Sequence, residues 1–307
     1  MKRIHALPDH VKAMLAVITG FFCFATGDIF QKSLTTHYPA STIGVCGMLF
    51  CLMFLIGYAA LRGQLGYYTR ILGWRIYAIR ATIMAVQYVF FLTAISTEPL
   101  ATVYTLSFIA PLVLTILVSI FLHEHPTPKT IIVLIIGFSG VLIALRPGDW
   151  QLNIGTLCAL GNGLLMAISY FSVRFFPKDD HWTVKTSVPL MIEVTVFAAL
   201  LLFLQGPIPM PEVKHIPQFM ISGAAMTFGL CLLVYAYAHG RAAVIAPFQY
   251  TGLIWGTLYG WLFFGNIIDI WTLSGAALII GAGLWLFLSH KAPEPLPDAA
   301  NSPKKDE

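Results

Sequence analysis

Charge is what this sequence has least of. Only 10% of its 307 residues are Asp, Glu, Lys or Arg, whereas 58% are hydrophobic and the mean hydropathy is +0.79. About a quarter of a typical soluble domain is charged. The composition therefore excludes a soluble globular protein of this length and predicts a chain whose outer surface faces lipid.

The chain also lacks the alternation of polar and apolar residues that marks membrane β-strands, because its apolar residues run continuously. A helix needs roughly 20 apolar residues to cross a bilayer core. We therefore predict an all-α membrane protein with ten transmembrane helices. The predicted spans are Ala13–Leu34, Ser41–Leu61, Trp74–Ser96, Leu100–Leu122, Thr130–Leu145, Ile154–Phe175, Thr183–Leu204, Pro217–Ala238, Ala242–Phe264 and Ile270–Ser289.

Catalytic and redox motifs are absent or incomplete. The sequence has no Cys-x-x-Cys pair and no GxxxxGK[ST] loop, which argues against a disulfide framework, a zinc site and an ATPase. Gly137-Phe-Ser-Gly140 matches the GxSG string of intramembrane hydrolases, but all nine histidines lie in loops, tails or span ends. His123-Glu-His125 lies in a predicted short turn with no further ligand nearby. We expect no catalytic residue, no metal and no cofactor.

The few basic residues are unevenly distributed. With the N-terminus inside, 14 Lys and Arg residues fall on the inner side, three fall outside, and Arg80 lies within the third span. Because Lys and Arg favour cytoplasmic loops, both termini are predicted to be cytoplasmic, in a bacterial inner membrane. The net charge of +4 reflects this bias and predicts no nucleic-acid partner. Residues 1–12 form a cytoplasmic segment, and residues 291–307 form a proline-rich tail that is predicted to be disordered.

The second half of the sequence repeats the first at a shift of 142 residues. The shift places Ala25–Lys32 on Ala167–Arg174 and Leu122-His-Glu124 on Phe264-Gly-Asn266. Because each half has an odd number of spans, the second half must enter the membrane from the opposite side, as in inverted-repeat transporters. Two such halves can rock about a shared site and expose it to each side in turn. The predicted five-helix repeats are residues 13–146 and residues 147–290.

Residues at the ends of the fourth and ninth spans resemble those of a known family. The first half has Ala110-Pro111 and Phe121-Leu-His-Glu124, and the second has Ala246-Pro-Phe-Gln-Tyr250 and Phe264-Gly-Asn266. This pattern resembles the EamA-type branch of the drug/metabolite transporter superfamily. The resemblance implies a ten-helix carrier with a cavity lined by the first, third, fourth, sixth, eighth and ninth spans. The family has an acidic residue after the fourth and ninth spans, which Glu124 matches and Asn266 does not.

Ionisable residues within the spans are candidates for coupling, gating or binding, because they are costly in lipid and usually face a cavity or a partner. Asp28 and Lys32 share a helix face, so they could form a self-neutralising pair or an outer gate. Glu193 lies near the bilayer centre, where burial favours the protonated carboxyl, so it is either a structural residue or a proton carrier. Arg80 could reach the cytoplasmic interface or hold a carboxylate or phosphate in the cavity.

Polar and aromatic side chains of the third, fourth, eighth and ninth spans are the candidate cavity lining. Tyrosine and tryptophan combine an apolar body with a polar tip that can hold a metabolite, although those near span ends could be interfacial anchors. Pro111 and Pro247 remove backbone donors and can kink their helices beside the cavity. The predicted substrate-binding residues are Arg80, Gln87, Tyr88, Tyr104, Tyr235, Gln249, Tyr250 and Trp255.

These features favour a secondary active transporter that moves a small polar metabolite, such as an amino acid or a derivative, by alternating access, with or without a coupled proton. Two other classes remain open: an intramembrane hydrolase acting through Ser139, and a membrane scaffold that transports nothing. The expected partners are a small-molecule substrate and the lipid bilayer, and the chain is expected to be a monomer or a homodimer. Neither the substrate nor the direction of transport follows from the residues.

Overall fold

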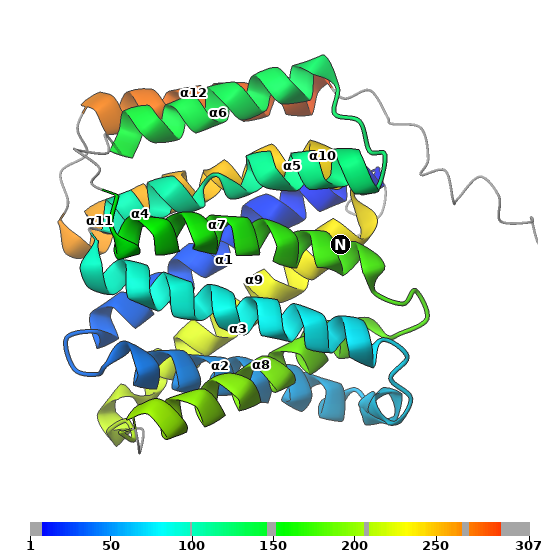
Figure 1. The fold of residues 1–307 in the computed structure, drawn as a ribbon, viewed down its shortest axis with the longest axis vertical. Helices are drawn as coiled ribbons and strands as arrows, with labels where there is room; N and C mark the ends of the chain where they lie inside the picture. Colours follow the sequence, from blue (N-terminus) through cyan, green and yellow to red (C-terminus); the bar gives the residue numbers. More distant parts are fainter. Residues whose placement is uncertain (1–7, 99, 146–151, 206–208, 266–269, 290–307) are drawn as a thin grey trace, which may run out of the picture.

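A computed structural model describes residues 8–98, 100–145, 152–205, 209–265 and 270–289. All the regular elements in these ranges are helices, and they form one bundle (Figure 1). The α-helices are α1 Asp9–Leu34, α2 Ala40–Leu61, α3 Trp74–Thr97, α4 Leu100–Ser107, α5 Ala110–Phe121, α6 Pro128–Leu145, α7 Ile154–Ser172, α8 Trp182–Gln205, α9 Ile216–His239, α10 Ala242–Ile245, α11 Thr251–Phe264 and α12 Ile270–Ser289. The short 3₁₀ helices are η1 Leu65–Thr69, η2 Val173–Phe175, η3 Val213–His215 and η4 Ala246–Tyr250.

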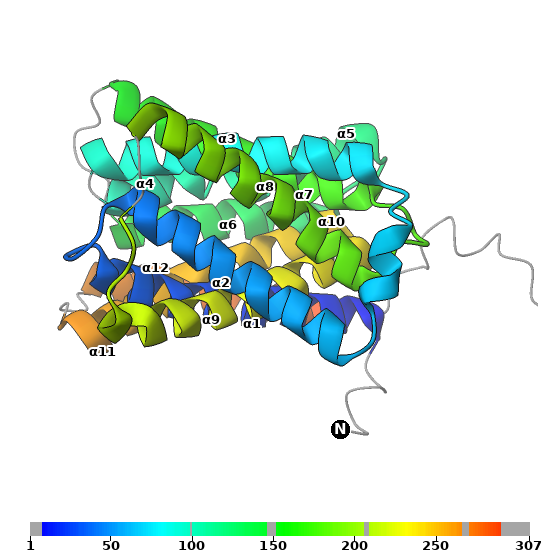
Figure 2. The ribbon, with the colours of Figure 1, turned by 90° about the horizontal axis from the view of Figure 1, so that it is seen from below.

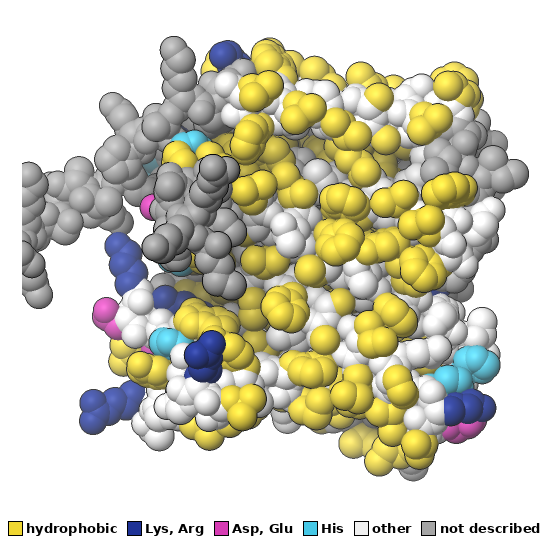
Figure 3. All heavy atoms as spheres, turned by 180° about the vertical axis from the view of Figure 1, so that it is seen from behind, with side chains coloured by type: hydrophobic (Ala, Val, Ile, Leu, Met, Phe, Trp, Pro, Cys, Tyr) yellow, Lys and Arg dark blue, Asp and Glu magenta, His cyan; other side chains and the backbone are white. Residues whose placement is uncertain are grey.

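The outer surface of the bundle suits a bilayer. Seven stretches of the described chain are helical, long and apolar enough to cross a membrane, and Pro128–Ala144 is a shorter apolar helix. In Figure 3, hydrophobic side chains cover the middle of the surface and charged side chains gather towards two opposite edges. A bilayer core accepts apolar side chains and excludes charge, so this is the surface of an integral multi-pass membrane protein. The all-α membrane class predicted from the sequence is confirmed.

Two of the predicted spans, the fourth and the ninth, are interrupted rather than continuous. The fourth consists of α4, which ends at Ser107, and α5, which begins at Ala110, and the ninth is divided into α10, η4 and α11. Pro111 and Pro247 lie in the first turn of α5 and of η4. A proline at this position loses no helical hydrogen bond but prevents the preceding helix from continuing, which explains both interruptions. By contrast, α12 coincides with its predicted span.

Local sequence explains where individual helices begin and end. The Asn153 side chain accepts a hydrogen bond from the Thr156 amide (3.0 Å), and the Thr156 hydroxyl accepts one from the Asn153 amide (3.0 Å). This reciprocal cap satisfies two backbone donors at the start of α7. The helix α11 is followed by Gly265, whose φ of 65° lies in the left-handed region that glycine adopts without strain.

Helices of the first half pack mainly against helices of the second half. Figure 2 shows α3 and α7, which pack together, on one side of the bundle, and the packed pair α1 and α9 on the other. In the same way, α2 packs on α9 and α3 packs on α8, while α6 and α12 lie side by side at one edge (Figure 1). The helices α1 and α7, which begin the two halves, run in opposite directions (Figure 1). Exchanging the halves reproduces these pairings, which supports the inverted repeat predicted from the sequence.

Equivalent positions in the two halves also make equivalent contacts. The Asp180 carboxylate accepts a hydrogen bond from the Gly73 amide (3.0 Å). The 142-residue shift places Tyr38 on Asp180 and Gly73 on His215. The Tyr38 hydroxyl is hydrogen bonded to Nδ1 of His215 at 2.7 Å. Each contact joins the two halves, so the shift found in the sequence also relates contacts in the fold.

Glycine brings α6 and α12 into direct backbone contact. A Cβ atom on Gly140 would lie 2.8 Å from the carbonyl oxygen of Gly275, and one on Gly275 would lie 2.6 Å from the Cβ atom of Ala144. These distances are shorter than a carbon atom allows, so both positions need glycine for the helices to approach. Gly140, the last residue of the Gly137-Phe-Ser-Gly140 string, therefore allows the close packing of α6 against α12.

We expect Gly275→Ala to lower the free energy of unfolding by about 1–3 kcal/mol, because the added methyl group must push α12 away from α6. Thermal unfolding of the purified protein in detergent measures the change. Gly281→Ala on the same helix is the matched control, since a Cβ atom there would meet nothing within 4 Å. Equal melting temperatures for the two variants would refute the close contact between α6 and α12.

Candidate functional site

A cavity of about 740 Å³ lies between the two halves of the chain. Its wall is formed mainly by α1, α2, α3 and α4 of the first half and by α7, α8, α9 and α11 of the second, with one residue each from α6, η2 and α12. It therefore includes α2 and α8 as well as the spans expected from the resemblance. Pockets that bind small molecules commonly have volumes of roughly 300–1,000 Å³. The polar lining residues are Asp28, Gln31, Lys32, Arg80, Gln87, Tyr88, Tyr104, Ser107, Asn162, Ser169, Tyr170, Glu193, Tyr237, Thr257, Tyr259 and Thr272.

The cavity reaches one end of the bundle and stops short of the other. Lys32 near the end of α1 and Thr272 near the start of α12 line it at one end, which we call the open end. In the other direction the lining stops at the level of Val173 and Tyr237. We call the end beyond them, where α1 begins and α12 finishes, the closed end (Figure 1).

The structure brings seven of the eleven predicted site residues to this cavity, from α1, α3, α4 and α8. These helices are apolar on most of their faces, so hydropathy does not mark the side that faces the cavity. The rare polar side chains mark it instead, because they avoid lipid. The seven residues are Asp28, Lys32, Arg80, Gln87, Tyr88, Tyr104 and Glu193.

Tyr235 is one of four predicted residues that lie outside the cavity lining. It is 36% exposed, and its ring stacks on His239 with centroids 4.6 Å apart. Two residues further along α9, Tyr237 is fully buried and lines the cavity. Positions two apart on a helix point in directions about 200° apart, so only one of these tyrosines can face inward.

The other three lie on the ninth span, where η4 changes the direction of the side chains. Gln249 is fully buried, and its amide donates a hydrogen bond to the Tyr237 hydroxyl (2.6 Å), so it supports the wall without lining the cavity. Tyr250 is also buried and packs in a cluster with α6. Trp255 packs edge-on against Phe22 of α1, with centroids 5.2 Å apart. The prediction that these residues line the cavity is wrong for this structure.

Arg80 is anchored inside the protein and does not extend to the cytoplasmic interface. Its guanidinium group donates hydrogen bonds to the Ser169 carbonyl and to the Ser172 hydroxyl (3.2 Å). Its Cζ atom also lies 5.7 Å from the centre of the Phe176 ring, in reach of a cation–π contact. With 3% of its surface exposed, Arg80 keeps a positive charge at the deep end of the cavity.

Asp28 faces the cavity without the expected partner. Among the described residues Asp28 has no hydrogen bond and no ion pair, so the predicted pair with Lys32 does not form. Its side chain is exposed even though α1 packs on both α9 and α11, because the cavity lies beside it. A carboxylate in this position is available to a ligand.

Glu193 is the second carboxyl group of the cavity. Only 3% of its surface is exposed, and its Oε2 atom has no hydrogen-bond partner among the described residues. The cationic Arg80 across the cavity interacts with it electrostatically. Glu193 lies one turn after Pro189, which interrupts the hydrogen-bond pattern inside α8. A buried carboxyl group without hydrogen bonds is costly to keep for structure alone.

Two features of the cavity were missed from the sequence. The Asn162 amide on α7 donates a hydrogen bond to the Ser107 hydroxyl (2.8 Å), which joins the halves at the break between α4 and α5. An asparagine in the middle of an apolar span is a signal that could have indicated this position. Tyr170 of α7 stacks on Tyr237 at the deep end of the cavity, with ring centroids 4.8 Å apart, and the sequence offers no comparable signal for Tyr170.

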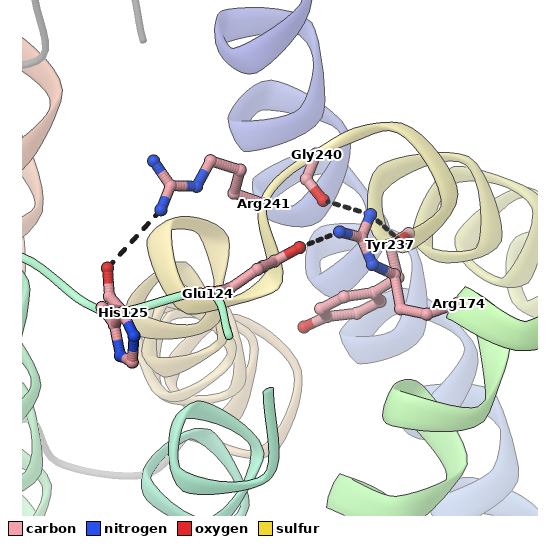
Figure 4. A network of polar contacts seen from close by, with 6 residues as sticks. All are labelled: Glu124, His125, Arg174, Tyr237, Gly240 and Arg241. Atoms are coloured by element: carbon pink, nitrogen blue, oxygen red, sulfur yellow. Dashed lines mark hydrogen bonds and ion pairs between the residues drawn. The ribbon is translucent and has the colours of Figure 1, made fainter. Parts of the chain in front are cut away.

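An ion pair between the halves seals the closed end (Figure 4). Glu124, after α5, accepts a hydrogen bond from the guanidinium group of Arg174 in η2. Arg174 also donates to the carbonyl oxygens of Gly240 (3.1 Å) and Tyr237 (3.4 Å) at the end of α9. The side chains of Arg174 and Glu124 are only 11% and 7% exposed. The acidic residue matched by the resemblance thus holds three segments together below the cavity.

The EamA-like transporter family matches the chain twice, at residues 11–146 and at residues 153–288. The second match is displaced from the first by 142 residues at its start (11 to 153) and at its end (146 to 288). This displacement equals the shift that relates the two halves in the sequence and in the contacts described above.

Curated relatives are similar over much of their length. An uncharacterized transporter of Helicobacter pylori is 24% identical over 282 residues, which cover 89% of this chain and 93% of the relative. An S-adenosylmethionine uptake transporter of Rickettsia bellii is 28% identical over 200 residues, or 64% of this chain and 67% of the relative. The pseudopaline exporter CntI of Pseudomonas aeruginosa is 24% identical over 219 residues, or 69% of this chain and 75% of the relative.

A crystal structure shares the fold. It superposes on this chain with a TM-score of 0.78, and the superposition covers 91% of this chain and 97% of the other. The sequence identity is 15%, so this likeness concerns the arrangement of helices alone.

We expect Glu124→Gln to open the closed end more often, because removing one partner of a buried ion pair costs about 3–5 kcal/mol and leaves the Arg174 charge uncompensated. The test places a cysteine at the deep end of the cavity (Val173→Cys) and adds an impermeant maleimide on the Glu124 side of sealed vesicles. Labelling should be faster with Glu124→Gln than without it.

The control for this experiment is Arg241→Gln, because the one side-chain hydrogen bond of Arg241 to a described residue is a long one to the His125 carbonyl (3.5 Å), and Arg241 makes no ion pair with Glu124 (Figure 4). It should leave the labelling rate close to that of the parent. If Glu124→Gln and Arg241→Gln labelled alike, the ion pair would have no special part in closing this end.

Proposed function

The chain belongs to the EamA-like transporter family, and we propose that it is a secondary carrier that moves a small polar metabolite across the membrane by alternating access. The cavity between the halves carries this proposal. It is large enough for a metabolite, polar side chains line it within an apolar bundle, and it reaches only one end. Family and relatives are named as transporters rather than enzymes, which favours the same conclusion.

The way in which the halves are joined supports alternating access. The open end leads to Asp28 and Lys32, whereas the Glu124–Arg174 pair holds the two halves together at the closed end. Breaking that pair while the halves close at the other end would expose the same cavity to the opposite side. With both termini in the cytoplasm, as the basic residues predict, the described state is outward-facing.

The substrate class rests on the cavity and not on the relatives. One relative is named for uptake of S-adenosylmethionine and another for export of pseudopaline, so related carriers differ in cargo and in direction. An amino acid, an amino-acid derivative or a similar molecule fits a cavity that combines amide, hydroxyl and aromatic groups with two carboxyl groups and two basic groups.

We assign the coupling role to Glu193. It is buried beside the cavity without a hydrogen bond to its Oε2 atom, so it can exchange a proton as the cavity changes sides. The charged and titratable groups that interact with it are Arg80, Tyr88 and Cys51. A proton bound here would be exposed to the two sides of the membrane in turn.

Purified protein in liposomes should move a substrate, identified by thermal-shift screening of a metabolite panel, without ATP. Gly256→Leu should reduce this transport to background without unfolding the protein, because Gly256 lines the cavity and a Cβ atom there meets nothing within 4 Å. Gly57→Leu is the matched control, since Gly57 on α2 is equally unobstructed but lies outside the lining. Equal transport by both variants would exclude this cavity as the path.

Glu193→Gln should abolish accumulation driven by a pH gradient while it preserves exchange of labelled for unlabelled substrate, because only the first process needs a net proton movement. The control is Glu212→Gln, which neutralises an exposed carboxylate that pairs with Lys214 at 2.7 Å, and it should leave gradient-driven accumulation unchanged. Gradient-driven accumulation that survives Glu193→Gln would count against Glu193 as the proton carrier.

A further inference from the structure

The charged groups of the cavity are not equally engaged. Arg80 at the deep end directs its donors at Ser169 and Ser172. Neither Asp28 nor Glu193 accepts a hydrogen bond from a described residue. These two carboxyl groups of the cavity therefore have acceptor oxygens to offer to a ligand that brings positive charge.

Comparison of the halves shows that the fold does not need these charges. The Arg80 guanidinium donates to the carbonyl oxygen of Ser169. The 142-residue shift places Arg80 on Ser222 and Gly27 on Ser169. There the Ser222 hydroxyl donates to the Gly27 carbonyl (3.2 Å), so a neutral side chain makes the equivalent contact. This contact therefore does not require the positive charge of Arg80, because a serine makes the equivalent contact in the other half.

The same comparison holds for the two carboxyl groups. The shift places Asp28 on Tyr170 and Glu193 on Cys51, both uncharged. Tyr170 stacks on a neighbouring ring, and Cys51 packs in an apolar cluster. Equivalent helices therefore pack at these positions without an acid, which leaves the two acids to be explained by what enters the cavity.

We propose that Asp28 is the counter-ion for a positively charged nitrogen or sulfur of the substrate, so that the carrier selects organic cations with an apolar body. This inference rests on the proposed transport function. Asp28 is preferred to Glu193 because its side chain is exposed to the cavity, whereas Glu193 is almost completely buried.

Aromatic rings complete the cation site. Tyr88 and Tyr104 line the cavity, and both are close enough to Asp28 to interact with it electrostatically. Tyr88 packs edge-on against Phe197, with ring centroids 4.8 Å apart. Its hydroxyl lies against Gly44, where a side chain would leave no room for it. A carboxylate that shares a cavity with tyrosine rings attracts a cation by charge, and the ring faces can add cation–π contacts.

The rest of the wall suits the apolar body of such a molecule. Gly252, Gly256 and Gly260 recur every four residues along α11 and all line the cavity, so this helix presents its backbone as a flat surface. Met84 and Met226 line the cavity from α3 and α9. Methionine side chains are flexible and polarizable, so they adapt to an irregular or aromatic ligand surface.

The test compares a quaternary ammonium ion with a neutral molecule of the same shape, and a sulfonium ion with its thioether, which has lost the charge on sulfur and is neutral overall. Thermal unfolding of the full-length protein in detergent is measured with choline against 3,3-dimethylbutan-1-ol, and with S-adenosylmethionine against S-adenosylhomocysteine. At least one cation should stabilise the protein with an affinity at least about tenfold higher than that of its neutral counterpart, as expected for one buried charge contact. Asp28→Asn should abolish that difference.

The matched control is Asp179→Asn, which removes the same charge from an exposed loop residue and should leave the cation preference unchanged. A second measurement needs no variant: amidation of Asp28 by a water-soluble carbodiimide, followed by mass spectrometry, should be slowed by the cation and not by its neutral counterpart. Equal responses to cation and neutral molecule, no response to either cation, or a preference that survives Asp28→Asn would overturn the assignment.

The cation-binding experiment and the transport assay can succeed or fail independently of each other. Cation binding through Asp28 without flux in liposomes would support the cation site and reject the transport proposal. Flux of an anionic or neutral metabolite, with no cation preference, would support transport and reject the cation site.

Discussion

Close packing between the two halves is the constraint on which the rest of the structure depends. Lipid does not drive helices together by the hydrophobic effect, so they associate through small residues that allow close approach. At the contact of α1 with α9, a Cβ atom on Gly229 would lie 3.0 Å from the Gly20 carbonyl oxygen. In the equivalent contact of α3 with α7, the shift places Gln87 and Asn162 at these positions, and both line the cavity. Glycine thus stands at both positions in one contact, whereas its counterpart has two amide side chains that face the cavity.

The two ends of the cavity differ in the same way. At the closed end, Glu124 and Arg174 form an ion pair between the halves with little exposure to solvent. The shift places Asn266 and Lys32 at the equivalent positions of the open end, and Asn266 lies outside the described residues. Asn266 carries no charge, so the shift does not predict a copy of the Glu124–Arg174 ion pair at the open end.

Much of the fold and part of the site could be predicted because a bilayer imposes simple rules. A span must be apolar and helical, and a polar residue within it must face protein or a cavity. Gln87, Tyr88 and Tyr104, which were chosen on this rule, line the cavity, and their part in substrate binding stays a prediction. The rules failed on the ninth span, where 3₁₀ winding over Ala246–Tyr250 turns Gln249 into the wall. Hydropathy treats such a segment as a continuous helix, so it cannot report the changed direction of the side chains.

The sequence by itself determined the membrane class, the helical spans and the 142-residue repeat, because each depends on the order of residue types along the chain. The tertiary structure alone decided which polar groups share the cavity, that Asp28 lacks a protein partner, and that Glu124 meets Arg174 across the halves. The physical reason is that lipid exposure constrains the composition of a span, whereas helix rotation and the pairing of distant segments depend on side-chain packing between helices far apart in sequence.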